Sequence, residues 1–286
     1  MSNPSGTLYV VATPIGNLGD MSPRAVQVLT DVDTIAAEDT RHTGRLLAHF
    51  GVRRPLLSLH EHNETQRVSR LLGLLEQGRS IALVSDAGTP LVNDPGYRIV
   101  RACHARSIRV VPVPGPCAAI TALSAAGLPT DAFVFEGFLP AKRSARRRFL
   151  QARRQERRTL VFYESPRRLT EALEDLVELM GPGREATLAR ELTKKFETLR
   201  WGTLADLLEQ VRGDESWRRG ELVLLVHGRE AGGEPAPDEA VTAMLETLLG
   251  ELPLNQAVRL AAALTGMNKN TLYAEALRLK SGKQAD

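Results

Sequence analysis

The chain has 286 residues, of which 43% are hydrophobic, 25% charged and 5% aromatic, and its net charge is +3. This length accommodates two compact domains and a small appendage, each with its own core. The longest apolar runs, Ile81–Val84 and Leu222–Val226, are far shorter than a membrane span. The N-terminus also lacks the basic start and apolar stretch of a secretory signal. We therefore expect a soluble, cytoplasmic protein with no membrane segment.

The first part of the chain alternates apolar strands with amphipathic helices. The first strand spans residues 7–13, and Ser22-Pro23 after it is typical of a helix start. Further strands are expected at residues 34–37, 56–59, 81–85 and 109–112, and helices at residues 43–50, 65–77, 96–105 and 116–126. This order predicts a largely parallel sheet with helices on both faces.

A second α/β region of mixed strand order follows from about Phe133. Its strands are expected at residues 133–137, 159–163, 185–189, 197–203 and 221–227, and its helices at residues 143–153, 167–180 and 204–211. We place one α/β domain at residues 1–118, another at 119–228, a Gly- and Pro-containing linker at 229–237 and a helical element at 238–286. A Gly-containing turn at Gly266 separates the last two helices. It is compatible with a helix-turn-helix and with an ordinary helical hairpin.

Nine Lys or Arg residues lie between Lys142 and Arg158, with Glu156 as the one acidic residue among them. Such a block is either a solvated helix face or a phosphate-binding surface. Like charges one helical turn apart repel each other unless a polyanion neutralises them. The density of this block therefore favours nucleic acid binding. The two cysteines, Cys103 and Cys117, are too few for a four-thiolate zinc site and are expected to pack as reduced thiols.

Three loops rich in Gly and Pro follow predicted strands. Their sequences are TPIGNLGD at residues 13–20, SDAGTPLVNDPG at residues 85–96 and VPGPCAA at residues 113–119. Ligands of parallel sheets bind beyond the carboxyl ends of the strands, where these loops are expected to converge. The chain has neither the G-x-G-x-x-G motif of a dinucleotide fold nor the phosphate loop of a nucleotide triphosphatase.

Motifs along most of the chain closely resemble those of the ribosomal RNA small-subunit methyltransferase I family, which belongs to the tetrapyrrole-methylase, or class III, methyltransferases. In order, they are VATPIGNLGDMSPRA, AEDTRHTGRLL, LHEHNE, ALVSDAGTPLVNDPG, VPGPCAAITAL, FEGFLP, VFYESPRRL and ARELTKKFET. The resemblance runs from about Leu8 to His227, and residues 256–277 are similar to the family's C-terminal element. It implies a two-domain tetrapyrrole-methylase fold.

The resemblance also implies an activity. A member of this family transfers the methyl group of S-adenosylmethionine to the ribose 2′-hydroxyl of a cytidine in the decoding region of 16S rRNA, within the small ribosomal subunit. A homodimer is the expected assembly. The cofactor is expected in the cleft between the two domains, where the matching motif positions are Pro14, Gly88, Thr89, Leu91, Cys117, Ala118, Tyr163, Glu164, Ser165, Ala189, Arg190, Glu191 and Leu192.

Methyl transfer from a sulfonium requires alignment of the reacting atoms and no metal ion, so no metal is predicted. A ribose hydroxyl is a weak nucleophile, and a nearby base is useful. Each candidate base can instead cap a helix or satisfy a buried amide. The candidates at strand ends are Glu38, Asp39, His60, Glu61, Asp86 and Glu164. We favour Glu38 and Glu164 as catalytic, because each ends an apolar strand that faces the expected cleft.

His60 and His62 flank Glu61, and alternate residues of a strand share a face. This pattern permits a metal site, but no third ligand is evident nearby. The family resemblance instead places the segment near the substrate. The residues expected to contact RNA are Arg41, Arg45, His60, Lys142, Arg143, Arg146, Arg147, Arg148 and Arg167.

Two other functions are compatible with parts of this pattern. A methylase of the same fold that acts on a porphyrinoid uses the same loops, but it has no need of so basic a block. A non-catalytic RNA-binding protein uses the basic block, but it has no need of three Gly/Pro loops that converge on one cleft. The combination of both features favours an RNA methyltransferase.

Overall fold

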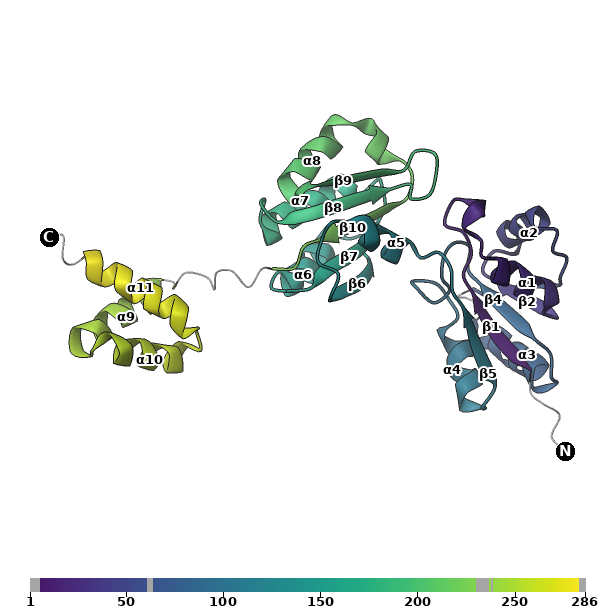
Figure 1. Ribbon diagram of the computed structural model, residues 1–286, viewed down its shortest axis with the longest axis horizontal. Helices are drawn as coiled ribbons and strands as arrows, with labels where there is room; N and C mark the ends of the chain where they lie inside the picture. Colours follow the sequence, from purple (N-terminus) through teal and green to yellow (C-terminus); the bar gives the residue numbers. More distant parts are fainter. Residues whose placement is uncertain (1–5, 61–63, 230–236, 238, 283–286) are drawn as a thin grey trace. The chain divides into compact units, whose positions relative to one another are not determined.

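The computed structural model describes residues 6–60, 64–229, 237 and 239–282. The chain forms two compact units, one ending at Gly228 and the other beginning at Arg229 (Figure 1). Two five-stranded sheets and the helices around them form the first unit, and the described part of the second contains three helices. No helix in the described ranges is both long and apolar enough to cross a lipid bilayer.

The first sheet is entirely parallel, and its strand order is β3-β2-β4-β1-β5. Its strands are β1 (Thr7–Val11), β2 (Thr34–Ala37), β3 (Leu56–Ser58), β4 (Ile81–Val84) and β5 (Arg109–Val113). The helices α1 (Pro23–Asp31) and α2 (Thr40–His49) cover one face, and α3 (Glu64–Glu76) and α4 (Tyr97–Ala105) cover the other. The inner strands β2 and β4 are buried along their whole length, as is typical of parallel strands between helices, whereas the edge strands β3 and β5 are partly exposed.

The strand order creates a topological switch point between β1 and β4. These strands are hydrogen-bonded neighbours, but α1 follows β1 on one face and α4 follows β4 on the other. The chain therefore diverges at their carboxyl ends and leaves a crevice there. In open α/β sheets, this crevice is the usual place for a ligand.

The second sheet is mixed, with the strand order β6-β7-β10-β8-β9. Its strands are β6 (Phe133–Phe138), β7 (Thr159–Glu164), β8 (Glu185–Arg190), β9 (Thr198–Thr203) and β10 (Leu222–Val226). Only the β6–β7 pair is parallel among the pairs of this sheet in the described residues. The parallel first sheet, the mixed second sheet and the C-terminal helices confirm the predicted fold class.

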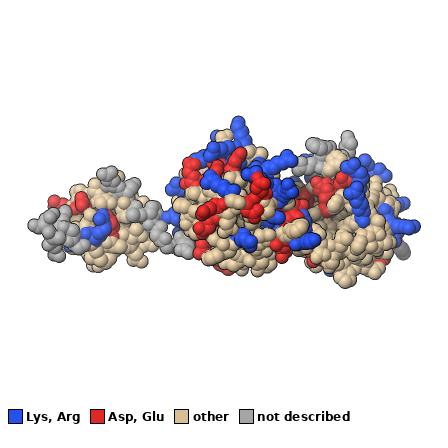
Figure 2. Space-filling model, turned by 90° about the horizontal axis from the view of Figure 1, so that it is seen from above, with Lys and Arg blue, Asp and Glu red and all other residues tan. Residues whose placement is uncertain are grey.

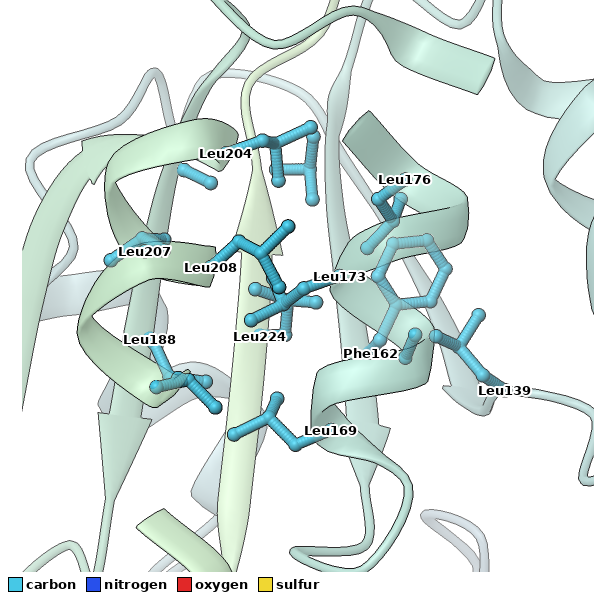
Figure 3. Close-up of a cluster of buried hydrophobic side chains, with 14 of the residues drawn as sticks. Leu139, Phe162, Leu169, Leu173, Leu176, Leu188, Leu204, Leu207, Leu208 and Leu224 are labelled. Carbon is cyan, nitrogen blue, oxygen red and sulfur yellow. The ribbon is translucent and has the colours of Figure 1, made fainter. Parts of the chain in front are cut away.

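Helices cover both faces of the second sheet. One face packs against α5 (Ala118–Ala125), and the other packs against α7 (Leu169–Met180) and α8 (Leu204–Gly213). Figure 3 shows leucines of α7 and α8 directed toward Phe162 and Leu224 of the central strands. Because these side chains are almost entirely buried, they form the main core of this part of the chain.

The second unit contains α9 (Glu239–Glu251), α10 (Leu254–Thr265) and α11 (Lys269–Gly282). Its small core includes Leu245, Val258 and Leu272, one from each helix. Gly266 ends α10 in the left-handed conformation with a φ of 70°. That conformation favours glycine and turns the chain into α11.

The basic block corresponds to α6 (Arg143–Arg153) and its flanks, and much of its charge is neutralised within the chain. Asp175 of α7 accepts hydrogen bonds from Arg146 at 2.8 Å, Arg147 at 3.1 Å and Arg143 at 3.2 Å. Arg146 and Asp175 are completely buried. Burial alone would raise the pKa of Asp175, but the three arginines outweigh it and hold this pKa below its ordinary value.

A polyanion is therefore not needed to neutralise the whole block. Carboxylates of α7 already do so for three of its arginines, with Glu171 contacting Arg146 and Glu178 contacting Arg147. Arg146 in particular is too buried to be an RNA contact. On the face drawn in Figure 2, acidic and basic side chains are similarly interspersed, and no unbroken basic surface is visible.

We predict that Asp175→Ala lowers the free energy of unfolding by about 3–5 kcal/mol, because it leaves the buried Arg146 guanidinium without its partner. Urea denaturation followed by circular dichroism measures this loss. Glu178→Ala is the matched control, since it removes an exposed carboxylate of the same helix and should have a much smaller effect. Equal effects of the two substitutions would contradict the structural importance of the buried pair.

Candidate functional site

A pocket of about 450 Å³ lies at the carboxyl ends of the parallel strands and extends along one end of the second sheet. Its volume is within the range of small-molecule sites, about 300–1,000 Å³. The first sheet and its loops contribute Ile15, Glu38, residues 86–89, residues 92–94, Cys117 and Ala118. The second sheet and its loops contribute Phe138, residues 163–166, Leu192 and residues 220–223.

Backbone hydrogen bonds join the loops that follow β1 and β4. The amide of Thr13 donates to the Gly88 carbonyl at 2.9 Å, and the amide of Gly88 donates to the Thr13 carbonyl at 3.0 Å. The Thr89 hydroxyl then donates to the Pro116 carbonyl at 2.9 Å, which adds the loop after β5. The three Gly/Pro loops consequently meet at the switch point of the sheet.

The loops beside the pocket contain several residues with positive φ. Leu91 has a φ of 71° and Asn93 a φ of 66° in the loop after β4. Glu191 and Thr193 have φ values of 50° and 66° in the loop between β8 and β9. Non-glycine residues rarely adopt this conformation, and such residues cluster at functional sites. The backbone beside the pocket is therefore held in conformations that are unusual for these residue types.

Eight of the residues expected to bind the cofactor line this pocket. They are Gly88, Thr89, Cys117, Ala118, Tyr163, Glu164, Ser165 and Leu192. The others, Pro14, Leu91, Ala189, Arg190 and Glu191, do not.

These five residues lie behind or beside the pocket, and the contacts of each explain why it is not part of the lining. Pro14 is buried, Leu91 packs on the core under α4, and Ala189 belongs to the core beside α5. The Arg190 guanidinium lies over the Trp217 ring at 5.7 Å, and the Glu191 carboxylate accepts a hydrogen bond from Lys194 at 2.9 Å.

Sequence reasoning missed several pocket residues. Residues 220–223 enter because β10 runs antiparallel to β7, so Leu222 lies opposite Glu164. No local sequence signal specifies that pairing. Phe138 was missed as well, although it lies in the FEGFLP motif. The sequence feature that could have indicated Phe138 is Gly137, since a glycine within a strand often marks a bulge.

The pocket is acidic. Five of its lining residues carry carboxylates, and no described residue that lines it is Lys, Arg or His. The five are Glu38, Asp86, Asp94, Glu164 and Glu221. Burial raises the pKa of Asp94, and the charge of Asp86 adds to this effect. Two of the five carboxylates are paired with cations outside the lining, Glu164 with Arg168 at 2.7 Å and Glu221 with Lys194 at 3.1 Å. The remaining excess of carboxylates favours a cationic ligand and disfavours a phosphate.

Glu164 is the most buried of these acids, with a side chain that is 0% exposed. Its Oε1 atom accepts a hydrogen bond from the Ser165 amide at 2.6 Å and pairs with Arg168 at 2.7 Å. Its Oε2 atom has no hydrogen-bond partner within the described part of the chain. Burial raises the pKa of Glu164, although Ser165 and Arg168 oppose the shift. This carboxylate has one oxygen held by the protein and a second oxygen that is buried without a hydrogen-bond partner among the described residues.

The other candidate bases differ in their surroundings. Glu38 ends β2 and lines the pocket. Asp39 instead caps α2, because its carboxylate accepts hydrogen bonds from the amides of Arg41 and His42 and from the Arg41 side chain. These bonds lower the pKa of Asp39 to about 2. Asp86 lines the pocket and accepts a hydrogen bond from the Asp39 amide at 2.9 Å.

The predicted RNA contacts are distributed unevenly. Several are exposed on elements that begin near pocket residues, namely Arg41 and Arg45 of α2, Lys142 and Arg148 of the basic block, and Arg167. Arg143 is exposed and Arg147 partly exposed, but both are paired with α7 carboxylates. His60 is half-buried and lies outside the pocket lining. Glu61 and His62 are outside the described residues. Across the described ranges, no group of three or more His, Cys, Asp or Glu side chains is arranged to hold a metal ion.

Comparisons with known proteins agree with this architecture. A family model described as "Tetrapyrrole (Corrin/Porphyrin) Methylases" matches residues 7–208, and one described as "RsmI C-terminal HTH domain" matches residues 234–280. Ribosomal RNA small subunit methyltransferase I of Escherichia coli O157:H7 is 56% identical, with 96% of each chain covered. The protein of the same name from Pseudomonas aeruginosa is 55% identical, with 98% of this chain and 99% of the relative covered.

Solved structures share the fold. The methyltransferase CobJ has a TM-score of 0.58 at 22% identity and covers 80% of this chain and 98% of its own. Uroporphyrin-III-C-methyltransferase from Thermus thermophilus has a TM-score of 0.55 at 24% identity and covers 78% of this chain and 94% of its own. At this identity, the likeness concerns the fold alone.

We predict that Gly88→Ala destabilises the protein by about 1–3 kcal/mol, because the residue has a φ of 85° that disfavours a Cβ. An added Cβ would also lie 3.2 Å from the Ile15 side chain. Chemical denaturation measures the change. The control is Gly73→Ala in α3, where a Cβ meets nothing within 4 Å and helix propensity predicts a gain of about 0.5–1 kcal/mol. A Gly88→Ala variant as stable as the unmodified chain would contradict the strain argument.

Proposed function

Since the chain belongs to the tetrapyrrole methylase family, and within it to the ribosomal RNA small subunit methyltransferase I proteins, we propose that it methylates 16S rRNA with S-adenosylmethionine. The proposed acceptor is the ribose 2′-hydroxyl of a cytidine in the decoding region of the small ribosomal subunit. The relatives' names support the RNA class, and the motif resemblance supports the cytidine and the ribose oxygen.

The acidic pocket at the switch point is the observation that best supports the donor. S-adenosylmethionine carries a positive sulfonium and an ammonium group, and the pocket presents carboxylates with no basic side chain among its described lining residues. Transfer of the methyl group leaves a neutral thioether. The carboxylates therefore attract the charged donor more strongly than the thioether product. This difference favours replacement of the product by a new donor molecule after each turnover.

We assign donor binding to the predicted residues that line the pocket. The backbone near Gly88 and Thr89 is shaped for close approach, and Cys117 and Ala118 line the pocket beside them at the start of α5. Tyr163, Ser165 and Leu192 line the pocket from the second sheet and its loops. Pro14, Leu91, Ala189, Arg190 and Glu191 support these walls from behind or beside the pocket. When bound, the cofactor supplies an electrophilic methyl group, and the protein's task is to align it with the ribose oxygen.

Glu164 and Glu38 are the proposed catalytic carboxylates. The Glu164 carboxylate, which lines the pocket, takes the proton of the ribose hydroxyl while Arg168 and the Ser165 amide hold its Oε1 atom. The raised pKa of Glu164 suits this role, because a general base is most effective when its pKa approaches the working pH. Glu38 lines the same pocket and helps to orient the ribose.

RNA phosphates are proposed to contact the exposed basic residues around the pocket. This set is Arg41, Arg45, His60, Lys142, Arg148 and Arg167, with Arg143 and Arg147 available in part. Arg146 is excluded by its burial. We also propose a cytoplasmic homodimer, in which exposed apolar side chains such as Tyr97, Ile120 and Trp201 are candidates for the buried surface.

We predict that the purified protein transfers tritium from labelled S-adenosylmethionine to a decoding-region cytidine of small subunits from cells that lack this activity. Nuclease mapping locates the label and shows whether it is on the ribose 2′-oxygen. The control is Thr89→Trp, whose indole should fill the pocket and abolish transfer. Transfer to a porphyrinoid with none to small subunits or free rRNA would overturn the RNA assignment and leave the methylase fold in place.

We predict that the acid limb of the kcat/KM profile lies above the ordinary pKa of a glutamate, because burial raises the pKa of Glu164 and the base must be deprotonated. Activity should rise as pH increases through this raised pKa. In Glu164→Gln, kcat should fall about 100- to 10,000-fold, and the limb should disappear from the residual activity. Asp94→Asn is the matched control, since it removes another pocket carboxylate with a raised pKa. If the acid limb disappeared in Asp94→Asn and remained in Glu164→Gln, Asp94 would be the base instead of Glu164.

A further inference from the structure

The strand β6 contains a bulge at the point where it reaches the pocket. Phe135 lies opposite Val161 of β7, Gly137 lies opposite Phe162, and the register shifts between them, so that Glu136 is the extra residue. Gly137 has a φ of 66°, a conformation that glycine adopts without strain. A bulge of this kind redirects the side chains that follow it.

The bulge changes the face of the sheet on which the Phe138 side chain lies. Side chains alternate between the two faces of a regular strand, so Phe135 and Phe138 would point in opposite directions. The extra residue places both on the same face, with ring centroids 4.9 and 5.5 Å from the Tyr163 ring. Leu139 then enters the opposite core near Phe162, as Figure 3 shows.

A contact between the two sheets fixes the bulge. A Cβ at Gly137 would lie 2.8 Å from the Asn93 side-chain oxygen, so the loop after β4 packs directly on the bulge. Asn93 has its own left-handed conformation, with a φ of 66°. The position of Phe138 is therefore set by both the second sheet and the loop that contributes Gly88 and Thr89 to the pocket.

Phe138 lines the pocket, yet 51% of its surface is exposed. One part of the ring packs on Tyr163, and the rest is accessible to a ligand. The described lining residues offer no cation that could hold a phosphate inside the pocket, and the carboxylates repel one. A nucleotide entering this pocket must therefore be held there by uncharged contacts.

We propose that the Phe138 ring stacks on the nucleobase of the target nucleotide and thereby positions its ribose at the pocket. The inference rests on the proposed function and deepens it, because it assigns substrate positioning to one side chain. Unpaired RNA bases are commonly held by stacking on aromatic side chains. Phe138, Glu38 and Glu164 line the same pocket, so a base on this ring places its sugar near the proposed carboxylates.

The test compares Phe138→Ala with Phe133→Ala, a substitution of an exposed phenylalanine at the start of the same strand that does not line the pocket. Loss of one stacked base should raise KM for the small subunit about 5- to 150-fold in Phe138→Ala. The dissociation constant for S-adenosylmethionine should stay unchanged, and Phe133→Ala should resemble the unmodified protein in both. Phe138→Trp should restore KM, because an indole also stacks.

A spectroscopic measurement tests for the stacking itself. The fluorescence added by Phe138→Trp should be quenched by a decoding-region RNA fragment, and that added by Phe133→Trp should not. An unchanged KM in Phe138→Ala would overturn the inference while methyl transfer by the unmodified protein still supports the proposed function. Weaker S-adenosylmethionine binding in Phe138→Ala would also overturn it and assign the ring to the cofactor. Absence of methyl transfer by the unmodified protein would instead remove the proposed function.

Discussion

The two backbone hydrogen bonds between Thr13 and Gly88 hold together the region on which the pocket depends. They join the loops after β1 and β4 where the connections of the parallel sheet diverge to opposite faces. Without this contact, the crevice at the switch point would open toward solvent between two separate loops. The third loop is added through Thr89 and Pro116, and Ile15 packs with Ala119 and Leu192 beneath the pocket. The strand order leaves a crevice at the switch point, and these hydrogen bonds between its loops give the crevice defined walls.

The pocket lining differs in charge from the surrounding surface, where acidic and basic side chains are interspersed. The pocket concentrates carboxylates, and exposed basic residues such as Arg41, Lys142 and Arg167 lie on the elements that follow its strands. This arrangement suits a reaction between a cationic methyl donor and a polyanionic acceptor, since each partner meets the sign of charge that attracts it. The arginines around Asp175 have a different role, because they join α6 to α7 inside the fold.

The sequence predicted most of the architecture because buried parallel strands such as β2 and β4 are short, continuously apolar and followed by helices. It placed the start of α2 too late, since the capping role of Asp39 was not recognised in a run of polar residues. It also predicted that the glycine-rich loops meet. It did not reveal that Leu222 lies opposite Glu164, because antiparallel pairing between distant strands leaves no local pattern. The burial of Arg146 was equally hidden, since its partner Asp175 lies on another helix.

The contact between Asn93 and Gly137 makes the residue that one sheet can accept at this point depend on the residue in the other. A larger residue at position 137 has no room while an asparagine occupies position 93 in its present conformation, and movement of the loop at position 93 would also displace Gly88 and Thr89. Sequence drift at either position is therefore constrained by the other. A substitution at position 137 of β6 therefore has to remain compatible with the loop of the first sheet that lines the same pocket.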